Sequence, residues 1–290
     1  MLKKIIYNRY VNFCLRNFCY FFKPWLPDRL RIPVSGLFCL KISPQEKIKI
    51  YTNPTSYITK QLFWEGADNY EFTHIFKKLI SHSTCFVDVG ANFGYYSLLA
   101  AKLNPSTKVH TFEPSPGPFK YLEDNVSFNK LEQNITLYKL ALSNSEEMLE
   151  FNVIENKKFP NYLNLSGEHN AGSKNLTSKT SSIQVKSSAL DILYKLEKIT
   201  DLDLIKIDVE GAEYPVIQGA IQLLKDCKPI IICELLTQKN ASLVESKLNS
   251  IGYETYYYAS KSLFKLEKIV VDERYKTDYF FIHPEKNILY

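Results

Sequence analysis

The chain has 290 residues, of which 45% are hydrophobic and 23% are charged. This composition excludes a disordered or fibrous protein, and it allows a large core without disulfide or metal support. The formal net charge of +5 is small for this length, so we do not expect nucleic-acid binding. The six cysteines form no CxxC pair and no zinc-finger spacing, which is typical of a protein from a reducing, cytoplasmic compartment.

Residues 1–33 form a basic, aromatic segment that we expect to be helical up to Pro24. Arg9 and Arg16 interrupt its apolar stretch, which excludes both a secretory signal and a membrane-spanning helix. Two interpretations remain open. We favour a helix that packs its aromatic face against the domain. The alternative is that residues 1–23 form a basic amphipathic helix lying on a membrane surface.

The next segment, residues 34–80, is expected to precede the main domain. Short alternating runs such as LFCLKI and KIKIYT predict small strands between residues 34 and 63, and apolar spacing predicts a helix over residues 70–80. From residue 81 to residue 290, apolar strands alternate with helices. This pattern predicts an α/β domain with a mostly parallel sheet and helices on both faces. The aromatic segments ETYYYAS and DYFFIHP are expected to pair antiparallel at one edge.

A polar insertion at about residues 155–188 interrupts this alternation between the third and fourth parallel strands. It is rich in Asn, Ser, Lys and Gly and has little periodicity. A loop of this length inside a compact domain is usually functional or mobile. We expect it to emerge near the carboxyl edge of the sheet or to return as a hairpin. It is the candidate lid over a bound substrate.

The first candidate binding site follows the strand TCFVDVG. Gly90 and Gly94 lie in a strand-to-helix turn at the expected ligand edge of an α/β sheet. The turn lacks the GxGxxG spacing and the P-loop lysine, which argues against NAD and ATP. Asp88, at the strand end, suits a ligand with an amino group, as the methionine part of S-adenosylmethionine has.

Other carboxylates follow the later strands. Glu113 ends the next strand about 20 positions after the glycine turn, where it can accept hydrogen bonds from both ribose hydroxyls. The strand LIKI delivers Asp208, Glu210 and Glu213, and Glu234 ends a further apolar strand. Buried acids are costly unless they are paired or used, so this group indicates chemistry or metal binding. For Glu213, a structural role at a helix N-terminus is equally consistent.

Four segments, DVGANFGYYS, FEPSP, DLIKIDVEGAEYPVIQGA and IICE, together resemble the FkbM family of methyltransferases. The resemblance covers roughly residues 64–283, and it includes the segment from Trp64 to Glu71, which is similar to a short family motif with a longer insert. It implies a Rossmann-like fold with an antiparallel last strand, S-adenosylmethionine as the methyl donor, and transfer to an oxygen. The implied acceptor is a glycan or a small molecule.

The resemblance also implies roles for individual residues. Contacts with the methionine and ribose parts of the donor would come from Asp88, Gly90, Asn92 and Gly94. Glu113 would hold the ribose hydroxyls, and Leu142 and Ser143 would lie at the adenine. Asp208 would face the transferred methyl group. The insertion at residues 155–188 departs most from the family and is expected to select the acceptor.

Several interpretations of the chemistry remain open. The base that takes the acceptor's proton is Glu210, Glu234 or His169, the last of which lies in the polar insertion. Alternatively, Asp208, Glu210 and Glu234 hold a divalent cation such as Mg²⁺. The rival functions are a non-catalytic nucleoside-binding or membrane-surface domain and a nicotinamide-dependent oxidoreductase. The sequence leaves the oligomeric state open.

Overall fold

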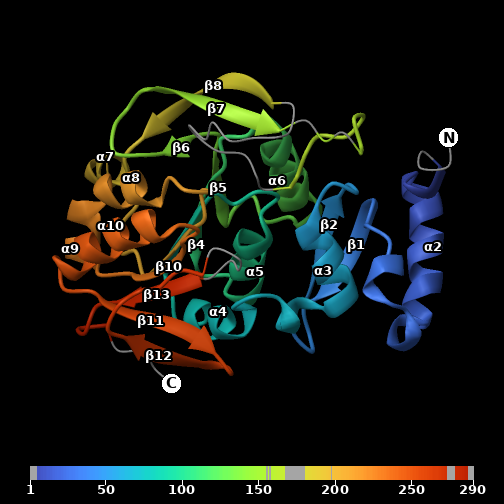
Figure 1. The fold of residues 1–290 in the computed structure, drawn as a ribbon, viewed down its shortest axis with the longest axis horizontal. Helices are drawn as coiled ribbons and strands as arrows, with labels where there is room; N and C mark the ends of the chain where they lie inside the picture. Colours follow the sequence, from blue (N-terminus) through green and yellow to red (C-terminus); the bar gives the residue numbers. More distant parts are fainter. Residues whose placement is uncertain are drawn as a thin grey trace.

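A central sheet organises the part of the chain that the computed structural model describes, namely residues 5–154, 156, 158–166, 180–196, 198–272 and 278–286 (Figure 1). The strands of this sheet within the described residues are β3 (Cys85–Val89), β4 (Lys108–Phe112), β5 (Ile135–Tyr138), β9 (Leu204–Ile207), β10 (Ile230–Glu234), β11 (Glu254–Ala259), β12 (Ser262–Leu266) and β13 (Asp278–Ile282). Their order across the sheet is β12-β11-β13-β10-β9-β3-β4-β5.

The neighbouring strands β10, β9, β3, β4 and β5 run parallel, as the alternation of strands and helices predicted. Their carboxyl ends therefore meet at one edge of the sheet. β3 lies in the middle, with β4 on one side and β9 on the other, so the strand order reverses at this point. In open α/β sheets, ligands bind at such a switch point because the loops on its two sides diverge and leave a crevice.

The C-terminal strands form the antiparallel part of the sheet. β13 is antiparallel both to β10 and to β11, and β12 pairs antiparallel with β11 at the outer edge. This arrangement confirms the predicted Rossmann-like α/β fold with antiparallel strands on its C-terminal side.

Helices cover both faces of the central sheet (Figure 1). One face carries α4 (Thr73–Ile80), α5 (Tyr95–Leu103) and α6 (Pro116–Asn129). The other carries α7 (Leu190–Lys195), α8 (Glu213–Gln218), α9 (Ile221–Cys227) and α10 (Gln238–Asn249). Neighbouring strand residues alternate between the two cores, since Phe86 packs in the first and Val87 in the second. Burial on both faces explains why the central strands are apolar without interruption.

The N-terminal elements precede this sheet. They are helix α2 (Arg9–Phe21), strands β1 (Gly36–Lys41) and β2 (Lys47–Thr52), helix α3 (Tyr57–Glu65) and single 3-10 turns at Lys23–Trp25, Asp28–Leu30 and Ala67–Asn69. The predicted small strands are present, but the expectation of strands up to residue 63 is wrong beyond Thr52. The chain turns into α3 because the Ser56 hydroxyl caps it, accepting a hydrogen bond from the Thr59 amide at 3.2 Å.

Helix α2 lies against β1 with an unexpected face. We favoured a helix with its aromatic residues packed on the domain, and this expectation is wrong. The buried residues of α2 are Asn12 and Arg16, whereas Phe13, Phe18 and Phe21 are exposed. The polar pair is turned inward because it hydrogen-bonds the backbone that leads into β1.

The free side of β2 is closed by two side chains from α6. The Asn129 amide accepts from the backbone N–H of Lys49 and donates to its carbonyl, both at 2.7 Å. The Asn125 amide makes the same pair of bonds with Tyr51, and it also donates to the Phe93 carbonyl beside the glycine turn. The small hairpin is thereby joined to the main domain.

A second, smaller sheet of β6 (Ala141–Leu142), β7 (Met148–Ile154) and β8 (Thr180–Ser188) lies beyond the carboxyl end of β5 (Figure 1). β7 and β8 pair antiparallel over their length. The last nine residues of the polar insertion form β8 and return antiparallel to β7, which is the hairpin that the sequence analysis gave as one of two expectations. Within β8, Ile183 and Val185 pack against Phe151. His169, proposed as a candidate base, lies outside the described residues.

Candidate active site

The glycine turn after β3 is shaped by a close approach to β9. Gly90 has a φ of +75°, and a Cβ there would lie 1.8 Å from the carbonyl oxygen of Asp208. The amides of Gly90 and Ala91 donate to the Phe112 carbonyl at 3.0 and 3.1 Å. Only glycine can occupy this position, and its lack of a side chain lets three strand ends converge. Gly94, with a φ of +91°, then starts α5 against Leu122.

Glu113, directly after β4, stabilises this turn through hydrogen bonds. Its carboxylate accepts hydrogen bonds from the backbone amides of Asn92 and Ser115, both at 2.8 Å. Burial raises the pKa of Glu113 to about 7, although the two amide donors act in the opposite direction. Each carboxylate oxygen can accept a further bond, so Glu113 remains able to bind ligand hydroxyls.

An apolar pocket of about 250 Å³ opens at the carboxyl ends of the parallel strands. β3 and the turn after it contribute Val89 and Gly90, and Leu149 and Phe151 of β7 cover the other side. The remaining lining residues are Phe112, Pro114, Leu140, Ala141, Leu142, Ser143, Val209, Gly211, Ala212 and Pro215. A mostly apolar cavity at a switch point is suited to a planar nucleobase.

The predicted donor residues take different places around this pocket. Gly90, Leu142 and Ser143 line it directly. Glu113 lies between two lining residues of its own strand end. Asp88 is instead buried within the sheet, where its Oδ2 accepts a hydrogen bond from Ser97 at 2.6 Å. Asp88 is not among the residues that line the pocket, and its contact with the donor stays a prediction.

Three of the predicted acids come together beside the pocket. Asp208, Glu210 and Glu234 each offer a carboxylate oxygen, and these oxygens all lie within 4.8 Å of one another. Glu210 adopts a φ of +53° and is followed by Gly211 at +106°, so a sharp turn brings both acids after β9 toward the end of β10. Such a group can accept protons or bind a hard cation through oxygen.

Glu213 has a structural role, the alternative that we had weighed equally. It is fully buried, and its carboxylate accepts hydrogen bonds from the amides of Val209 and Gly211. Its second oxygen accepts from the side chain of Asn240 in α10. Glu213 thus fixes the turn that presents Asp208 and Glu210.

A buried cation, Lys206, underlies the site and was missed by the sequence analysis. Its ammonium lies 3.0 Å from Asp208 and 5.6 Å from the ring centre of Tyr96. Burial alone would lower the pKa of Lys206, but the carboxylates of Asp208, Asp88 and Glu71 raise it above its usual value. The signal in the sequence was a lysine between two isoleucines in a strand expected to be fully buried.

Glu71, an exposed residue, is the second member of the network around Lys206. Its carboxylate accepts a hydrogen bond from the Tyr96 hydroxyl at 3.0 Å, and local desolvation of this carboxylate raises its pKa. It ends the segment from Trp64 that we had likened to a family motif. The motif thus places a carboxylate under the ligand edge.

Comparisons with known proteins agree with this architecture. Residues 88–255, more than half of the chain, match the family described as the Methyltransferase FkbM domain. The chain is 23% identical over 244 residues to Methyltransferase 1 of Beauveria bassiana, covering 77% of this chain and 94% of the relative. It is 27% identical over 152 residues to Methyltransferase sdnD of Sordaria araneosa, covering 46% of this chain and 59% of that relative.

Among solved structures, Methyltransferase FkbM from Methylobacillus flagellatus aligns with a TM-score of 0.43 at 15% identity. The alignment covers 69% of this chain and 43% of that chain. The family match includes the glycine turn, the Glu113 strand and the Asp208 turn, which together form the edge described above. The chain therefore belongs to the FkbM family of methyltransferases.

Proposed function

We propose that this methyltransferase uses S-adenosylmethionine to methylate a hydroxyl oxygen of a sugar or another small molecule. The observation that carries the proposal is that pocket-lining residues and carboxylates alternate along the turn after β9. Val209 and Gly211 line the apolar pocket, whereas Asp208 and Glu210 belong to the carboxylate cluster. A nucleoside-sized pocket and a set of proton acceptors thus adjoin on four consecutive residues.

The residues around the pocket fit the donor. The nucleobase would lie against Leu142 and Ser143, and ionised Glu113 would accept hydrogen bonds from the ribose hydroxyls. When bound, S-adenosylmethionine supplies an electrophilic methyl group on a sulfonium. The pocket walls from β7 exclude water from one side of the nucleoside.

The carboxylate cluster fits an acceptor hydroxyl, which is a weak nucleophile until it loses its proton. Asp208 is paired with Lys206, so we assign it to orientation of the reacting groups. Glu210 or Glu234 then takes the proton. A second candidate arrangement is that all three acids hold Mg²⁺, which their converging oxygens favour and which would lower the pKa of the hydroxyl.

The first test is calorimetric titration of the protein with S-adenosylmethionine, beside Glu113→Ala and the surface control Glu254→Ala. We expect binding in the micromolar range by the wild type and the control, and none by Glu113→Ala. Absence of binding to the wild type would overturn the proposed donor. Binding without turnover on any acceptor would favour a non-catalytic nucleoside-binding domain.

A second test separates the two roles of the acids. Methyl transfer is measured over a panel of sugars and phenols, with and without EDTA, for the wild type, Glu210→Gln and Glu234→Gln. Turnover that survives EDTA but falls about 100-fold or more in one variant supports that residue as the base. Turnover lost in EDTA and restored by Mg²⁺ supports the metal arrangement.

A further inference from the structure

Helix α2 and the turn after it bury polar groups and expose aromatic ones, the reverse of a surface helix on a soluble domain. Asn12 is 0% and Arg16 is 1% exposed, whereas Phe18 is 68% and Phe21 is 78% exposed. The exposed aromatic face consists of Tyr10, Phe13, Phe18, Phe21, Phe22 and Trp25. An apolar surface of this extent usually marks an interaction site.

Buried hydrogen bonds fix this orientation. The Arg16 guanidinium donates to the carbonyl of Ser35 at 2.8 Å and to that of Leu37 at 2.5 Å. The Asn12 side chain donates to Pro33 at 3.0 Å and accepts from the Ser35 amide at 2.8 Å. Rotating the helix to bury its aromatic face would leave these polar groups without partners, which is costly.

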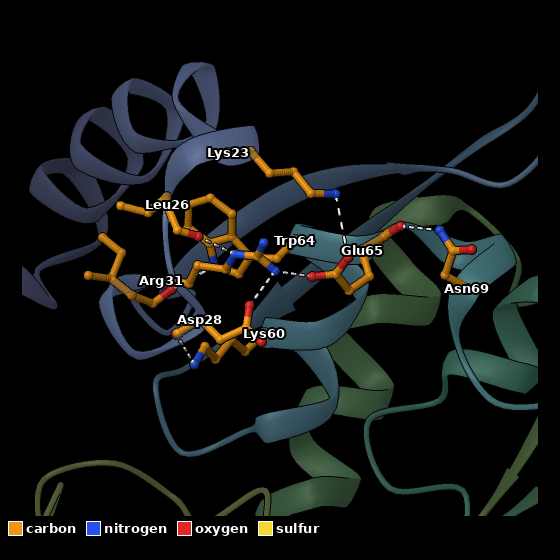
Figure 2. A network of polar contacts seen from close by, with 9 residues as sticks. Lys23, Leu26, Asp28, Arg31, Lys60, Trp64, Glu65 and Asn69 are labelled. Atoms are coloured by element: carbon orange, nitrogen blue, oxygen red, sulfur yellow. Dashed lines mark hydrogen bonds and ion pairs between the residues drawn. The ribbon is translucent and has the colours of Figure 1, made fainter.

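The turn that follows α2 is fastened to helix α3 (Figure 2). Arg31 pairs with Glu65 and with Asp28, and its guanidinium lies 5.9 Å from the ring centre of Trp64. Lys23 reaches Glu65 from the other side at 3.6 Å. These ion pairs hold the segment after α2, and with it the exposed aromatic face, in place against α3.

The net positive charge of the chain is concentrated in the same segment. Residues 1–27 contain five Lys and Arg residues and no acid, so the remainder of the chain has equal numbers of cations and acids. On the exposed side of α2, the Arg9 guanidinium lies 4.7 Å from the ring centre of Tyr10. Cations beside exposed aromatic rings are complementary to anionic headgroups above an apolar layer.

The helix is too short to pass through a bilayer. Its 13 residues correspond to about 20 Å, against a hydrocarbon core of about 30 Å. Among the described residues, none of the helices has the length and hydropathy needed to cross a membrane. An aromatic and cationic face on a short helix is instead typical of a helix lying in the plane of the membrane interface.

We propose that residues 5–30 dock this protein on a membrane surface that contains anionic phospholipids. The aromatic side chains enter the boundary between headgroups and acyl chains, and Arg9 lies near the phosphates. Figure 1 shows α2 at one end of the molecule, next to β1, where a flat surface can approach it. Docking on this face leaves the helices α7 to α10 on the far side of the domain free.

The test is flotation of the full chain with vesicles of phosphatidylcholine alone and of phosphatidylcholine with phosphatidylglycerol. We expect the wild type to float with the anionic vesicles and to be released by salt. Phe18→Ser/Phe21→Ser should lower the partition coefficient at least about tenfold. Phe264→Ser, at a residue of β12 that is 43% exposed, is the matched control and should float like the wild type.

Arg9→Gln supplies an independent variant, which should weaken binding to the anionic vesicles and leave binding to neutral vesicles unchanged. A wild type that stays unbound with both vesicles would overturn the proposal, as would a Phe18→Ser/Phe21→Ser variant that floats normally. Sedimentation velocity without lipid is the remaining control. A self-associated wild type that the double substitution converts to monomer would assign the face to contact between copies and also overturn membrane docking.

Discussion

Two buried cations, Lys206 beside the candidate active site and Arg16 in the N-terminal helix α2, differ in the groups that they contact. Lys206 lies under the carboxyl edge of the sheet among Asp208, Asp88 and Glu71, which raise its pKa against the effect of burial. Arg16 lies on the buried face of α2 and donates to backbone carbonyls. Burial lowers its pKa to about 10.

The difference lies in what would remain if the cation were removed. Around Lys206, the carboxylates of Asp208, Asp88 and Glu71 would lose the cation that they share, as expected where a protein keeps ionised groups for chemistry. Around Arg16, only neutral carbonyls would lose a donor. The first cation belongs to the candidate active site, and the second sets the orientation of a helix.

The largest loss of stability is expected at Gly90, where the backbone of the candidate active site packs closely. Gly90→Ala would place a Cβ 1.8 Å from the Asp208 carbonyl, so we expect a loss of more than about 4 kcal/mol in the free energy of unfolding, measured in urea. Gly211→Ala is the control. The φ of +106° at Gly211 is also unfavourable for alanine, but a Cβ there would have no other atom within 4 Å. This variant should lose only about 1 kcal/mol. Equal losses of stability in the two variants would show that the close contact between Gly90 and the Asp208 carbonyl is not the cause.

Lys206→Met tests the charged side of the comparison. We expect a loss of about 3–5 kcal/mol in the free energy of unfolding at pH 8, where the stabilisation by Lys206 is complete because this pH lies below its unfolded pKa. The loss should shrink as the pH falls, because desolvation raises the pKa values of Asp88 and Glu71 and they take up protons more readily than free carboxylates. A loss independent of pH would contradict the electrostatic account.

Arg16→Met tests the cation that orients α2. It removes donors from the carbonyls of Ser35 and Leu37, so we expect a loss of about 1.5–3 kcal/mol with no change between pH 5 and 8. Hydrogen exchange should increase in α2 before the central strands. Arg16→Lys, which keeps one cationic donor, should lose less. If Arg16→Met were as costly and as pH-dependent as Lys206→Met, the distinction between the two cations would fail.

The smallest effect concerns Glu113. Because its pKa is about 7, affinity for S-adenosylmethionine should rise about tenfold from pH 6 to 8 as the carboxylate forms, and calorimetry can follow this. The raised pKa has the opposite consequence for stability. The contribution of Glu113 to folding is complete below its unfolded pKa and is lost as the pH rises through about 7. Glu113→Gln should abolish both trends.

Much of the sheet could be predicted because its strands are buried on both faces. Runs such as CFVDV and IIICE allow few alternatives, and glycines or acids mark the strand ends. The convergence of Asp208, Glu210 and Glu234, which the sequence left as one alternative, agrees with the rule that parallel strands end at one edge. The two strands β9 and β10 that deliver these acids are neighbours in the sheet.

The remaining features depend on partners that are distant in the sequence. Lys206 could not be recognised as a buried cation until Glu71 and Asp88 were placed around it. The orientation of α2 was predicted wrongly because an aromatic face normally turns inward, and the carbonyls that bind Arg16 lie about 20 residues away. The hairpin of β7 and β8 was only one of two expectations for the insertion, and the bounds of β8 could not be predicted, because its pairing with β7, rather than its own composition, determines its conformation.

The two asparagines of α6 also have a consequence for how copies of this chain meet. An unpaired strand edge can recruit a strand from another molecule and so begin aggregation. On β2, Asn125 and Asn129 satisfy the outward N–H and C=O groups of Tyr51 and Lys49. A pair of side-chain amides therefore takes the place of a strand, so that the hairpin has no open backbone at these positions to template a fibril.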